Sequence, residues 1–205
     1  MGRDGTPTRN KILAQSRALV LQNGFSGTSI DLILERTGIT KGAFFYHFKT
    51  KNVLAQALIE EFAKEDIDTL ESALEQTEHL KTDPKERLLQ FVQLFIDMMT
   101  GLTEPYPGCL YASYTYEPNQ FDPKVMEPIS SAILQWRTTL VRLLSEVRQE
   151  YDMQQEVDIS SLADLFTVIF EGAYVVSKAL NEPDLVAQQL RQLSNYYELL
   201  FVPKQ

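Results

Sequence analysis

The chain has 205 residues, of which 44% are hydrophobic and 23% are charged, and its formal net charge is −9. This length can bury one large core, or the cores of a small and a larger domain, and we expect two helical units. The single cysteine, Cys109, excludes an intrachain disulfide framework and favours a reducing cytoplasm.

Neither a membrane segment nor an export signal is expected. The apolar runs are short and interrupted by charge, so none approaches the ~20 apolar residues of a membrane-spanning helix. Residues 1–8 contain Arg3 and Asp4 but no apolar signal-peptide core. The sequence therefore predicts a cytoplasmic protein without a membrane partner.

The charge is divided unevenly along the chain. Residues 1–55 carry eight basic and three acidic side chains, whereas residues 56–205 carry 11 basic and 25 acidic ones. The first part has a net charge of +5 and the second part −14. Because a phosphate-binding surface replaces condensed counterions with its own positive charge, only the first part is suited to nucleic acid.

Three short helices are predicted in this basic part. Residues 8–23 have apolar side chains at helical spacing, and a glycine follows. Thr28 or Ser29 can cap a second helix, and Gly38 suits a tight bend after it. Thr40 then caps a third helix. Three short helices, the last two joined by a tight turn, make a minimal helix-turn-helix unit.

The third helix has two different faces. At about 100° per residue, Phe44 and Phe48 lie together and pack inward, while Gly42 and Tyr46 point outward, flanked by Ala43 and Phe45. The helix has no Arg, Asn or Gln for a bidentate base contact. Sequence choice would therefore rest on Lys41, Tyr46, methyl contacts and DNA shape.

Four separated elements of this part occur in a characteristic order and spacing. They are Gly24-Phe25, Thr28-Ser29, Gly38 to Gly42, and Tyr46 to Lys51. Together they resemble the N-terminal signature of the TetR family of transcriptional regulators, and the resemblance covers residues 9–55.

The resemblance implies a homodimer that binds double-stranded operator DNA in the major groove and a C-terminal body that binds a small-molecule effector. The implied DNA contacts are Thr28, Thr40, Lys41, Gly42, Ala43, Phe45, Tyr46, His47 and Lys51. Thr28 and Thr40 lie at predicted helix starts, where free N–H groups favour phosphate. The family commonly has Tyr where this chain has Phe45, so a phosphate hydrogen bond from that position cannot form.

The whole chain is predicted to be all-α, with about nine helices. A helix-turn-helix DNA-binding domain is expected over residues 1–52, and a ligand-binding and dimerisation domain over residues 53–205. A long helix with an acidic outer face, from Lys51 to about Leu80, is the only covalent link between them. Any effector signal must therefore move this helix.

The predicted effector pocket combines a broadly apolar helix after Pro84 with a segment in which tyrosines alternate with small residues. Aromatic walls with hydroxyl groups are typical of small-molecule sites and indicate a lipophilic effector. Asp97, Glu117 or Glu171 would favour a cation if one of them faced inward. The predicted pocket residues are Phe91, Phe95, Met98, Met99, Cys109, Tyr111, Tyr114, Trp136, Phe166 and Phe170.

The last two predicted helices have broad apolar faces and too little remaining chain to cover them. They are therefore expected to pair with their copies in a four-helix dimer interface. In the TetR family the last two helices serve as the dimer contact. The predicted interface residues are Leu162, Leu165, Ile169, Ala173, Val176, Leu190, Leu193 and Tyr197.

Enzyme activity, metal binding and cofactors are not expected. No nucleotide-binding glycine loop, zinc-protease pair or serine elbow occurs, and His47 has no cysteine cluster nearby to complete a metal site. Two alternatives remain open. The N-terminal unit could dock protein instead of DNA, or Cys109, whose Gly-Cys-Leu setting resembles that of some redox-sensing TetR-family members, could sense electrophiles or oxidants.

The predicted mechanism is a two-state dimer that represses transcription. Two recognition helices about one helical turn of DNA apart, ~34–36 Å, read a palindrome. The effector binds more tightly to a conformation of the dimer in which the distance between the two recognition helices no longer matches the DNA, and its binding therefore releases the operator.

Overall fold

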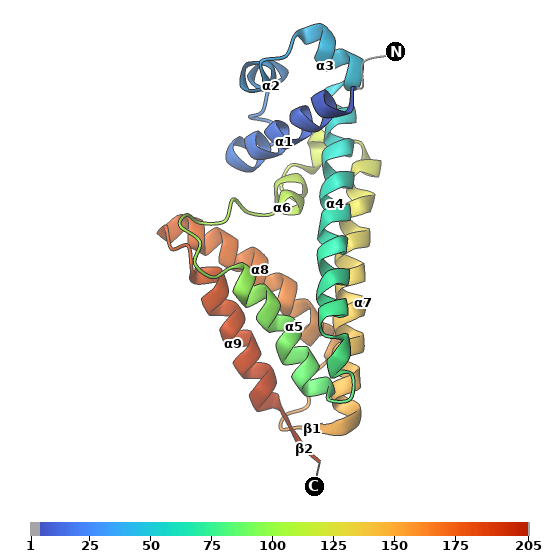
Figure 1. The fold of residues 1–205 in the computed structure, drawn as a ribbon, viewed down its shortest axis with the longest axis vertical. Helices are drawn as coiled ribbons and strands as arrows, with labels where there is room; N and C mark the ends of the chain where they lie inside the picture. The colour runs from blue at the N-terminus through green and yellow to red at the C-terminus, as the bar shows by residue number, and fades with distance from the viewer. Residues whose placement is uncertain (1–4, 205) are drawn as a thin grey trace. The chain divides into compact units, whose positions relative to one another are not determined.

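The computed structural model describes residues 5–204 and confirms an all-α fold (Figure 1). The α-helices of this range are α1 (Thr6–Asn23), α2 (Ile30–Thr37), α3 (Lys41–His47), α4 (Lys51–Gln76), α5 (Pro84–Met98), α6 (Leu110–Thr115), α7 (Glu127–Glu150), α8 (Ile159–Leu180) and α9 (Leu185–Leu200). The shorter elements are the 3-10 helices η1 (Glu78–Leu80), η2 (Pro118–Gln120) and η3 (Pro123–Met126) and the strands β1 (Tyr151–Met153) and β2 (Phe201–Pro203).

The chain divides into two compact units that do not follow chain order. The first contains the chain up to Glu65 and Pro107–Ser131, and the second contains Asp66–Tyr106 and the chain from Ala132 onward. These units differ from the predicted division between residues 52 and 53. The reason is that the first half of α4 and the segment around α6 pack with α1, α2 and α3.

Helices α1 and α2 form where apolar spacing predicts them. The buried face of α1 consists of Ile12, Leu13, Ser16, Leu19 and Val20. The helix ends at Gly24, whose φ of +74° is disfavoured for any residue with a Cβ. Helix α2 begins at Ser29, whose side chain accepts a hydrogen bond from the Leu32 N–H at 3.1 Å, and ends at left-handed Gly38.

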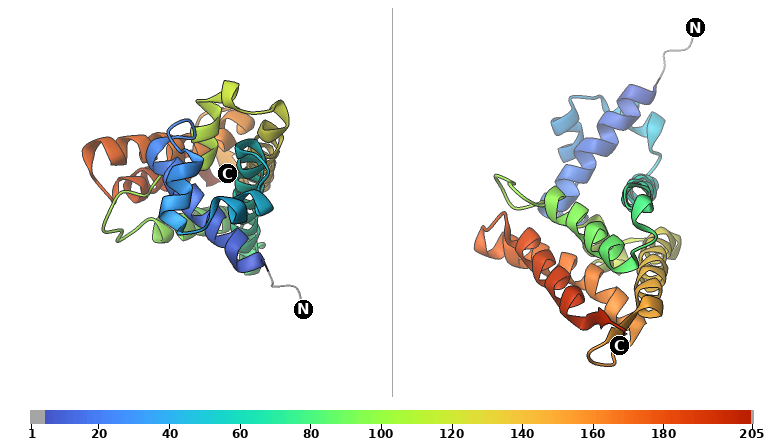
Figure 2. Two further views of the ribbon diagram at one scale, coloured as in Figure 1. Left: turned by 90° about the horizontal axis from the view of Figure 1, so that it is seen from above. Right: turned by 60° about the horizontal axis from the view of Figure 1, so that its bottom comes forward.

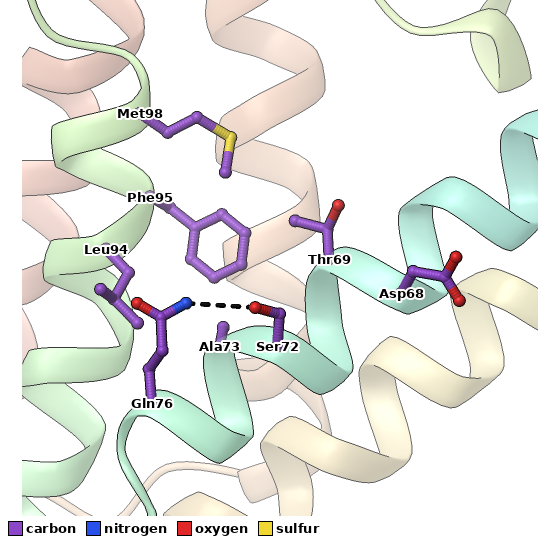
Figure 3. A pocket seen from close by; sticks show the side chains of 8 residues that line it. All are labelled: Asp68, Thr69, Ser72, Ala73, Gln76, Leu94, Phe95 and Met98. Carbon is purple, nitrogen blue, oxygen red and sulfur yellow. Dashed lines mark hydrogen bonds between the residues drawn. The ribbon is translucent and has the colours of Figure 1, made fainter.

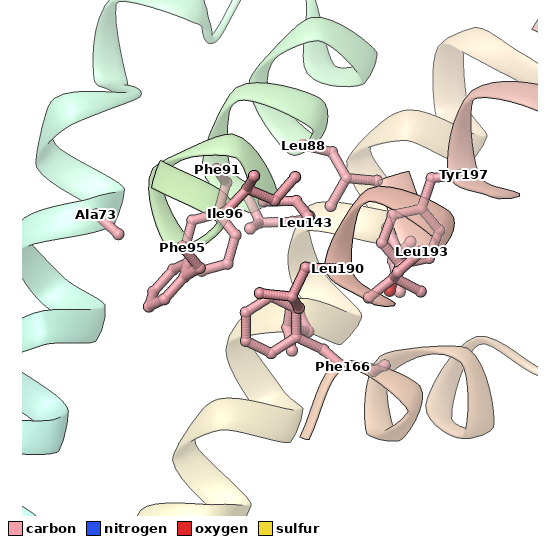
Figure 4. Packing of buried hydrophobic residues seen from close by; sticks show 14 of the residues in the cluster. Ala73, Leu88, Phe91, Phe95, Ile96, Leu143, Phe166, Leu190, Leu193 and Tyr197 are labelled. Atoms are coloured by element: carbon pink, nitrogen blue, oxygen red, sulfur yellow. The ribbon is translucent and has the colours of Figure 1, made fainter. Parts of the chain in front are cut away.

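The second unit is built around α5, α8 and α9, which lie side by side (Figure 2). Its core includes Leu88, Phe91, Phe95, Phe166, Leu190, Leu193 and Tyr197, which interdigitate in Figure 4. Burial of each such large side chain contributes about 1.5–3 kcal/mol. The Tyr197 hydroxyl is fully buried and donates to the Leu162 carbonyl at 3.2 Å, so α9 is joined to α8 by a hydrogen bond as well as by apolar packing.

Arg87 on α5 is a charged side chain inside this unit, with only 2% of its surface exposed. Its Nη1 donates to the Glu146 carboxylate on α7 at 3.2 Å, and its Nη2 lies 3.6 Å from Glu78. Arg142 also donates to Glu146, at 2.8 Å. Because a buried cation is costly without a partner, Glu146 is the group that makes this burial tolerable.

Strand β2, near the end of the chain, pairs antiparallel with β1, which follows α7. No sequence pattern predicts these two strands. Tyr151 is opposite Pro203, and Met153 is opposite Phe201. The Gln154 N–H extends the pairing by donating to the Leu200 carbonyl at 2.8 Å. Strands of three residues are too short to show a clear alternation of apolar and polar residues, which explains why the sequence did not reveal them.

Helix α8 corrects the expectation that no segment could span a membrane. It has 22 residues and a mean hydropathy of 1.5, which is long and apolar enough by length and composition alone. Core helices pass the same test, and one side of α8 packs into the second unit through Leu162, Ala163, Phe166, Ala173 and Ser177. The opposite side exposes Val168 and Val175, and Val176 and Leu180 are exposed near the end of the helix. The apolar residues of α8 are thus divided between a core face and an exposed face.

The Arg87 pair gives a prediction about stability. Replacing Glu146→Gln weakens the main partner of a buried cation, so we expect the free energy of unfolding to fall by about 1–3 kcal/mol in urea denaturation. The control is Glu150→Gln, an exposed carboxylate on the same helix, which should change stability by less than about 0.5 kcal/mol. Equal effects of the two variants would contradict the role given to Glu146.

Candidate nucleic-acid interface and effector cavity

The start of α3 is fixed by a hydrogen bond from a backbone N–H of its first turn to the side chain of the preceding residue, Thr40. Thr40 has an extended backbone, and its hydroxyl oxygen accepts from the Ala43 N–H at 3.2 Å. This is the N-cap that the sequence predicted, and it satisfies one of the free N–H groups of the first turn. The short turn from Gly38 to Thr40 therefore sets where the recognition helix begins.

The two faces of α3 are those predicted from the sequence. Phe44 and Phe48 are buried, with 0% and 1% of their surfaces exposed, whereas Tyr46 is 75% exposed. Phe45 is half-buried and packs edge-on against the Phe44 ring at 5.4 Å. The aromatic run is thus split, because Phe44 and Phe48 anchor the helix and Tyr46 is left on its outer side.

Most of the predicted DNA contacts lie on this outer side of α3. The exposed ones are Thr40, Lys41, Gly42 and Tyr46, and the half-buried ones are Ala43, Phe45 and His47. A Cβ added to Gly42 would meet no atom within 4 Å, so the glycine backbone is open to an approaching molecule. His47 packs edge-on against Tyr46 at 5.0 Å, as expected for a packing residue near the interface.

Of the other two predicted DNA contacts, Thr28 is buried, which corrects that prediction, and Lys51 is half-buried with a hydrogen-bond partner inside the first unit. Thr28 is buried, with 1% exposed, and its hydroxyl donates to the Gly24 carbonyl at 2.8 Å. Lys51 directs its ammonium to the Phe25 carbonyl, with an Nζ to O distance of 2.6 Å. Both side chains are therefore used to hold the turn between α1 and α2 rather than presented to a phosphate.

Two neighbouring residues, Ser29 and Thr50, have exposed hydroxyl groups at the helix starts where Thr28 and Lys51 were expected to contact DNA. Ser29 caps α2, and the Thr50 hydroxyl oxygen accepts from the Val53 N–H at 3.1 Å at the start of α4. The sequence named Ser29 as an alternative cap, but nothing in it distinguished Thr50 from its neighbour Lys51. Burial of Thr28 leaves Ser29 as the accessible member of the first pair, whereas in the second pair Thr50 is exposed and Lys51 is half-buried.

Within residues 5–55, the exposed basic residues are Arg9, Lys11, Arg36, Lys41 and Lys49. The Arg9 guanidinium lies 5.5 Å from the Phe48 ring centroid, and the Arg36 Nε donates to Gln15 at 3.3 Å. Arg17 is paired with Glu65 at 2.5 Å, so its charge is partly neutralised. The positive charge that remains accessible is the part suited to a phosphate backbone.

A cavity of about 500 Å³ lies in the second unit between α4 and α5 (Figure 3). Its polar wall consists of Asp68, Thr69, Ser72 and Gln76 on α4, and its apolar wall consists of Leu94, Phe95 and Met98 on α5, with Ala73 between them. The Gln76 amide donates to the Ser72 hydroxyl at 3.2 Å. This size and mixed lining are typical of sites for small organic molecules.

The structure divides the predicted pocket residues among several places. Phe95 and Met98 line the cavity between α4 and α5. Phe91, Trp136, Phe166 and Phe170 pack with Phe95 as a cluster of rings, and Met99 is buried in the same core. The Trp136 indole is stacked on Phe166 at 5.4 Å and donates to Asp66 at 3.0 Å. Aromatic residues at helical spacing were here core residues rather than a ligand wall.

The other three predicted pocket residues belong to the first unit. Cys109 precedes α6 and is half-buried, and Tyr111 packs edge-on against Phe62 at 4.8 Å. Tyr114 is buried and donates to the Ala55 carbonyl at 3.0 Å, and burial raises the pKa of its hydroxyl well above the ordinary value. Its hydroxyl therefore remains protonated and keeps donating at any physiological pH.

The acidic residues expected to favour a cation are also placed differently. Glu117 belongs to the first unit, where its carboxylate accepts from the Phe25 and Ser26 N–H groups. Asp97 is exposed and accepts from Gln93 at 2.7 Å. The acidic residue that lines the cavity is Asp68 on α4.

Five of the predicted dimer residues are buried inside a single chain, and this prediction is corrected. Leu162, Ala173, Leu190, Leu193 and Tyr197 have between 0% and 5% of their surfaces exposed. Leu165 and Ile169 are half-buried, and Val176 is exposed. The exposed apolar residues on these two helices are instead Val168, Val175, Val176 and Leu180 on α8 and Tyr196 and Leu199 on α9. Helical spacing identified the apolar helices but not which of two apolar faces turned inward.

Residues 5–204 contain no group of three or more His, Cys, Asp or Glu side chains that could hold a metal ion. His47, the histidine considered as a ligand, packs against Tyr46 and lies 6.5 Å from the Phe48 ring centroid. The candidate sites are therefore the outer face of α3 and the cavity between α4 and α5.

Two family models match the chain. The model described as "Bacterial regulatory proteins, tetR family" matches residues 12–58, and "Tetracyclin repressor-like, C-terminal domain" matches residues 84–193, more than half of the chain. The chain belongs to the TetR family. It is a TetR-family transcriptional regulator with a DNA-binding helix-turn-helix domain and a ligand-binding domain.

Individual relatives agree with this assignment. The HTH-type transcriptional repressor DhaR of Mycobacterium sp. (strain GP1) is 22% identical over 173 residues, which are 84% of this chain and 83% of DhaR. The HTH-type transcriptional activator FasR of Mycolicibacterium smegmatis is 26% identical over 110 residues, which are 54% of this chain and 48% of FasR. The crystal structure of a TetR-family regulator from Agrobacterium tumefaciens shares the fold, with a TM-score of 0.76 at 18% identity over 97% of this chain and 100% of that one.

The two faces of α3 give a prediction that separates DNA binding from stability. Tyr46→Ala should weaken binding to the protein's own promoter DNA by about 1–3 kcal/mol while leaving the melting temperature unchanged, because Tyr46 is not packed in the core. Phe44→Ala should lower the free energy of unfolding by about 3–5 kcal/mol, because Phe44 is fully buried. Fluorescence anisotropy and thermal melting measure the two effects, and equal losses of stability would contradict the assignment of the faces.

Proposed function

We propose that this TetR-family regulator is a repressor that binds a palindromic operator as a homodimer and is released by a lipophilic small molecule. The observation that carries the proposal is the outer face of α3, where Lys41, Gly42 and Tyr46 are exposed beside the capped helix start at Thr40. This face is the part of the basic N-terminal 55 residues that an α-helix entering the major groove would present to DNA.

The chemistry of this face indicates how an operator is recognised. Thr40 and Lys41 suit a phosphate, and the open backbone at Gly42 allows close approach to the DNA. Ala43 and Phe45 are placed for contact with a thymine methyl group, and Tyr46 can donate a hydrogen bond. Without Arg, Asn or Gln on α3, recognition depends on methyl contacts and on DNA shape more than on bidentate base contacts.

A homodimer is supported by the exposed apolar face of α8 and α9. Val168, Val175 and Leu180 are each more than half exposed on α8, and Leu199 is 67% exposed on α9. Several large apolar side chains exposed on two neighbouring helices are the kind of surface that a protein interface covers. Pairing with a second copy would cover them in a four-helix contact and bring two recognition helices to one DNA.

The cavity between α4 and α5 is the proposed effector site. One wall is apolar and the other carries the Asp68 carboxylate and the Ser72 and Gln76 side chains. An effector that combines an apolar body with a positive or hydrogen-bond-donating group would fit both walls. The same helix that supplies the polar wall begins at Lys51, so an effector that shifts α4 would act on the DNA-binding unit.

Repression rather than activation is the default that we adopt. DhaR is named a repressor and FasR an activator, so the direction of regulation is not set by the family. We also propose that the protein has no catalytic activity and is located in the cytoplasm. A regulator that binds an operator must be in the compartment that contains the DNA.

Salt dependence tests DNA binding through phosphates. Binding of the purified protein to its own promoter DNA should weaken by about a hundredfold or more when salt is raised from roughly 50 to 200 mM, because several phosphates are contacted. Anisotropy titrations at four salt concentrations measure the slope. A protein that shifts no promoter DNA even at low salt, or one whose binding is insensitive to salt, would argue for an apolar protein-docking module instead.

The dimer is tested by placing a charge on the exposed face of α8. Val175→Glu should weaken dimerisation at least about tenfold, because an ionised carboxylate would be desolvated in an apolar contact. Sedimentation velocity measures the dissociation constant. Leu134→Glu, a change of an exposed leucine on α7, is the control and should leave the dimer intact. A dimer unaffected by Val175→Glu would show that this face is not the interface.

A further inference from the structure

The turn between α1 and α2 is held by a carboxylate from a distant part of the chain. Glu117, which follows α6, accepts from the Phe25 N–H at 2.9 Å and from the Ser26 N–H at 3.0 Å. It also accepts a hydrogen bond from the Ser26 hydroxyl. Three donors of one turn thus converge on one side chain, and all these residues belong to the first unit.

The geometry of the turn is matched to this carboxylate. A Cβ added to Gly24 would lie 2.8 Å from the Glu117 Oε1, closer than side chains tolerate. Gly24 also has a φ of +74°, which independently favours glycine. The same position therefore supplies both the turn conformation and the space that Glu117 occupies.

The opposite side of the turn is held by Lys51. Its ammonium donates to the Phe25 carbonyl at 2.6 Å and lies 4.2 Å from the Phe25 ring centroid. The Phe25 ring packs against Phe121 at 4.5 Å and Tyr114 at 5.7 Å, both from the segment that carries Glu117. The Phe25 peptide groups and ring are thus fixed from three directions.

The electrostatics of the site favour the charged carboxylate. Partial burial would raise the pKa of Glu117, but the hydrogen bonds from Ser26 and Phe25 and the charge of Lys51 outweigh it and lower the pKa below its ordinary value. The carboxylate is therefore ionised at neutral pH. Hydrogen bonds to an ionised acceptor are about twice as strong as neutral ones.

The position of this turn gives it a role in DNA binding. It connects α1 to Ser29, the cap of α2, and α2 is joined to the recognition helix by the turn at Gly38. A change in the Phe25 and Ser26 peptide planes would tilt α2 and α3 together. Binding to a specific sequence depends on this angle, whereas attraction to DNA phosphates in general depends mainly on charge.

We propose that Glu117 is a positioning residue for operator recognition, which fixes the orientation of the helix-turn-helix by binding the turn between α1 and α2. The proposal rests on the proposed DNA-binding function and adds a residue outside the helix-turn-helix to it. The segment from Pro107 to Ser131 is in this view a structural part of the DNA-binding unit.

The test compares specific and nonspecific DNA binding in the full-length protein. Glu117→Gln keeps the shape of the side chain, but its amide NH₂ would face a donor of the turn. Its affinity for the operator should fall about tenfold or more, while its affinity for an unrelated duplex of equal length stays the same or rises, since a negative charge is removed. Glu117→Ala should behave likewise, and Ser26→Ala, which removes one of the three donors, should have a smaller effect.

The matched control is Asp122→Asn in the same segment. It removes the same charge from a residue that caps its own segment by accepting from the Lys124 N–H at 3.0 Å, and Asn is an equally good cap. Its ratio of operator to nonspecific affinity should equal that of the wild type.

The ratio of operator to nonspecific affinity decides the outcome. A purely structural role would lower the melting temperature without changing this ratio in fully folded protein, and an unchanged ratio in Glu117→Gln and Glu117→Ala would overturn the proposal. The wild type is measured first. If it showed no preference for its operator, the proposed DNA-binding function itself would fail, independently of Glu117.

Discussion

The fixation of Phe25 is the interaction on which the DNA-binding unit depends. Its N–H is bound by Glu117, its carbonyl by Lys51, and its ring by Phe121 and Tyr114. These partners come from the start of α4 and from the segment around α6, which are far apart in the chain. A helix-turn-helix of three short helices has little core of its own, so contacts from outside it determine how rigidly its recognition helix is held.

The recognition helix α3 combines anchoring and exposure within seven residues. Phe44 is fully buried on one side, and Tyr46, only two positions later, is 75% exposed on the other. The helix carries a single lysine, Lys41, and takes part in a unit whose basic side chains are concentrated in the first 55 residues of an acidic protein. In the proposed mode of DNA binding, affinity and sequence choice belong to different groups: the surrounding cations would attract DNA in general, and the small and aromatic side chains of α3 would contact the bases.

In the second unit, the same residue types serve two purposes. Phe91, Trp136 and Phe166 pack against one another and form a core, while the neighbouring Phe95 and Met98 also border a cavity with a polar wall. Helix α8 is likewise divided between a core face and an exposed apolar face. The second unit thus combines a packed aromatic core with an exposed apolar surface and a cavity, which are the features that we propose for dimerisation and effector binding.

The sequence by itself determined the local features. Helical spacing of apolar residues placed the helices, the N-cap at Thr40 and the bend at Gly38 placed α3, and the 100° rotation per residue assigned Phe44 inward and Tyr46 outward. Each of these depends on residues within a few positions of one another.

Where two residues could serve the same role, only the tertiary structure decided which of them does. It buried Thr28 and left Ser29 exposed as the cap of α2, turned Lys51 toward Phe25, and brought Glu117 to the α1–α2 turn instead of an effector pocket. It also selected which apolar face of α8 lies in the core. Such choices depend on contacts between residues distant in sequence, and neither spacing nor composition records which neighbours a side chain will meet after folding.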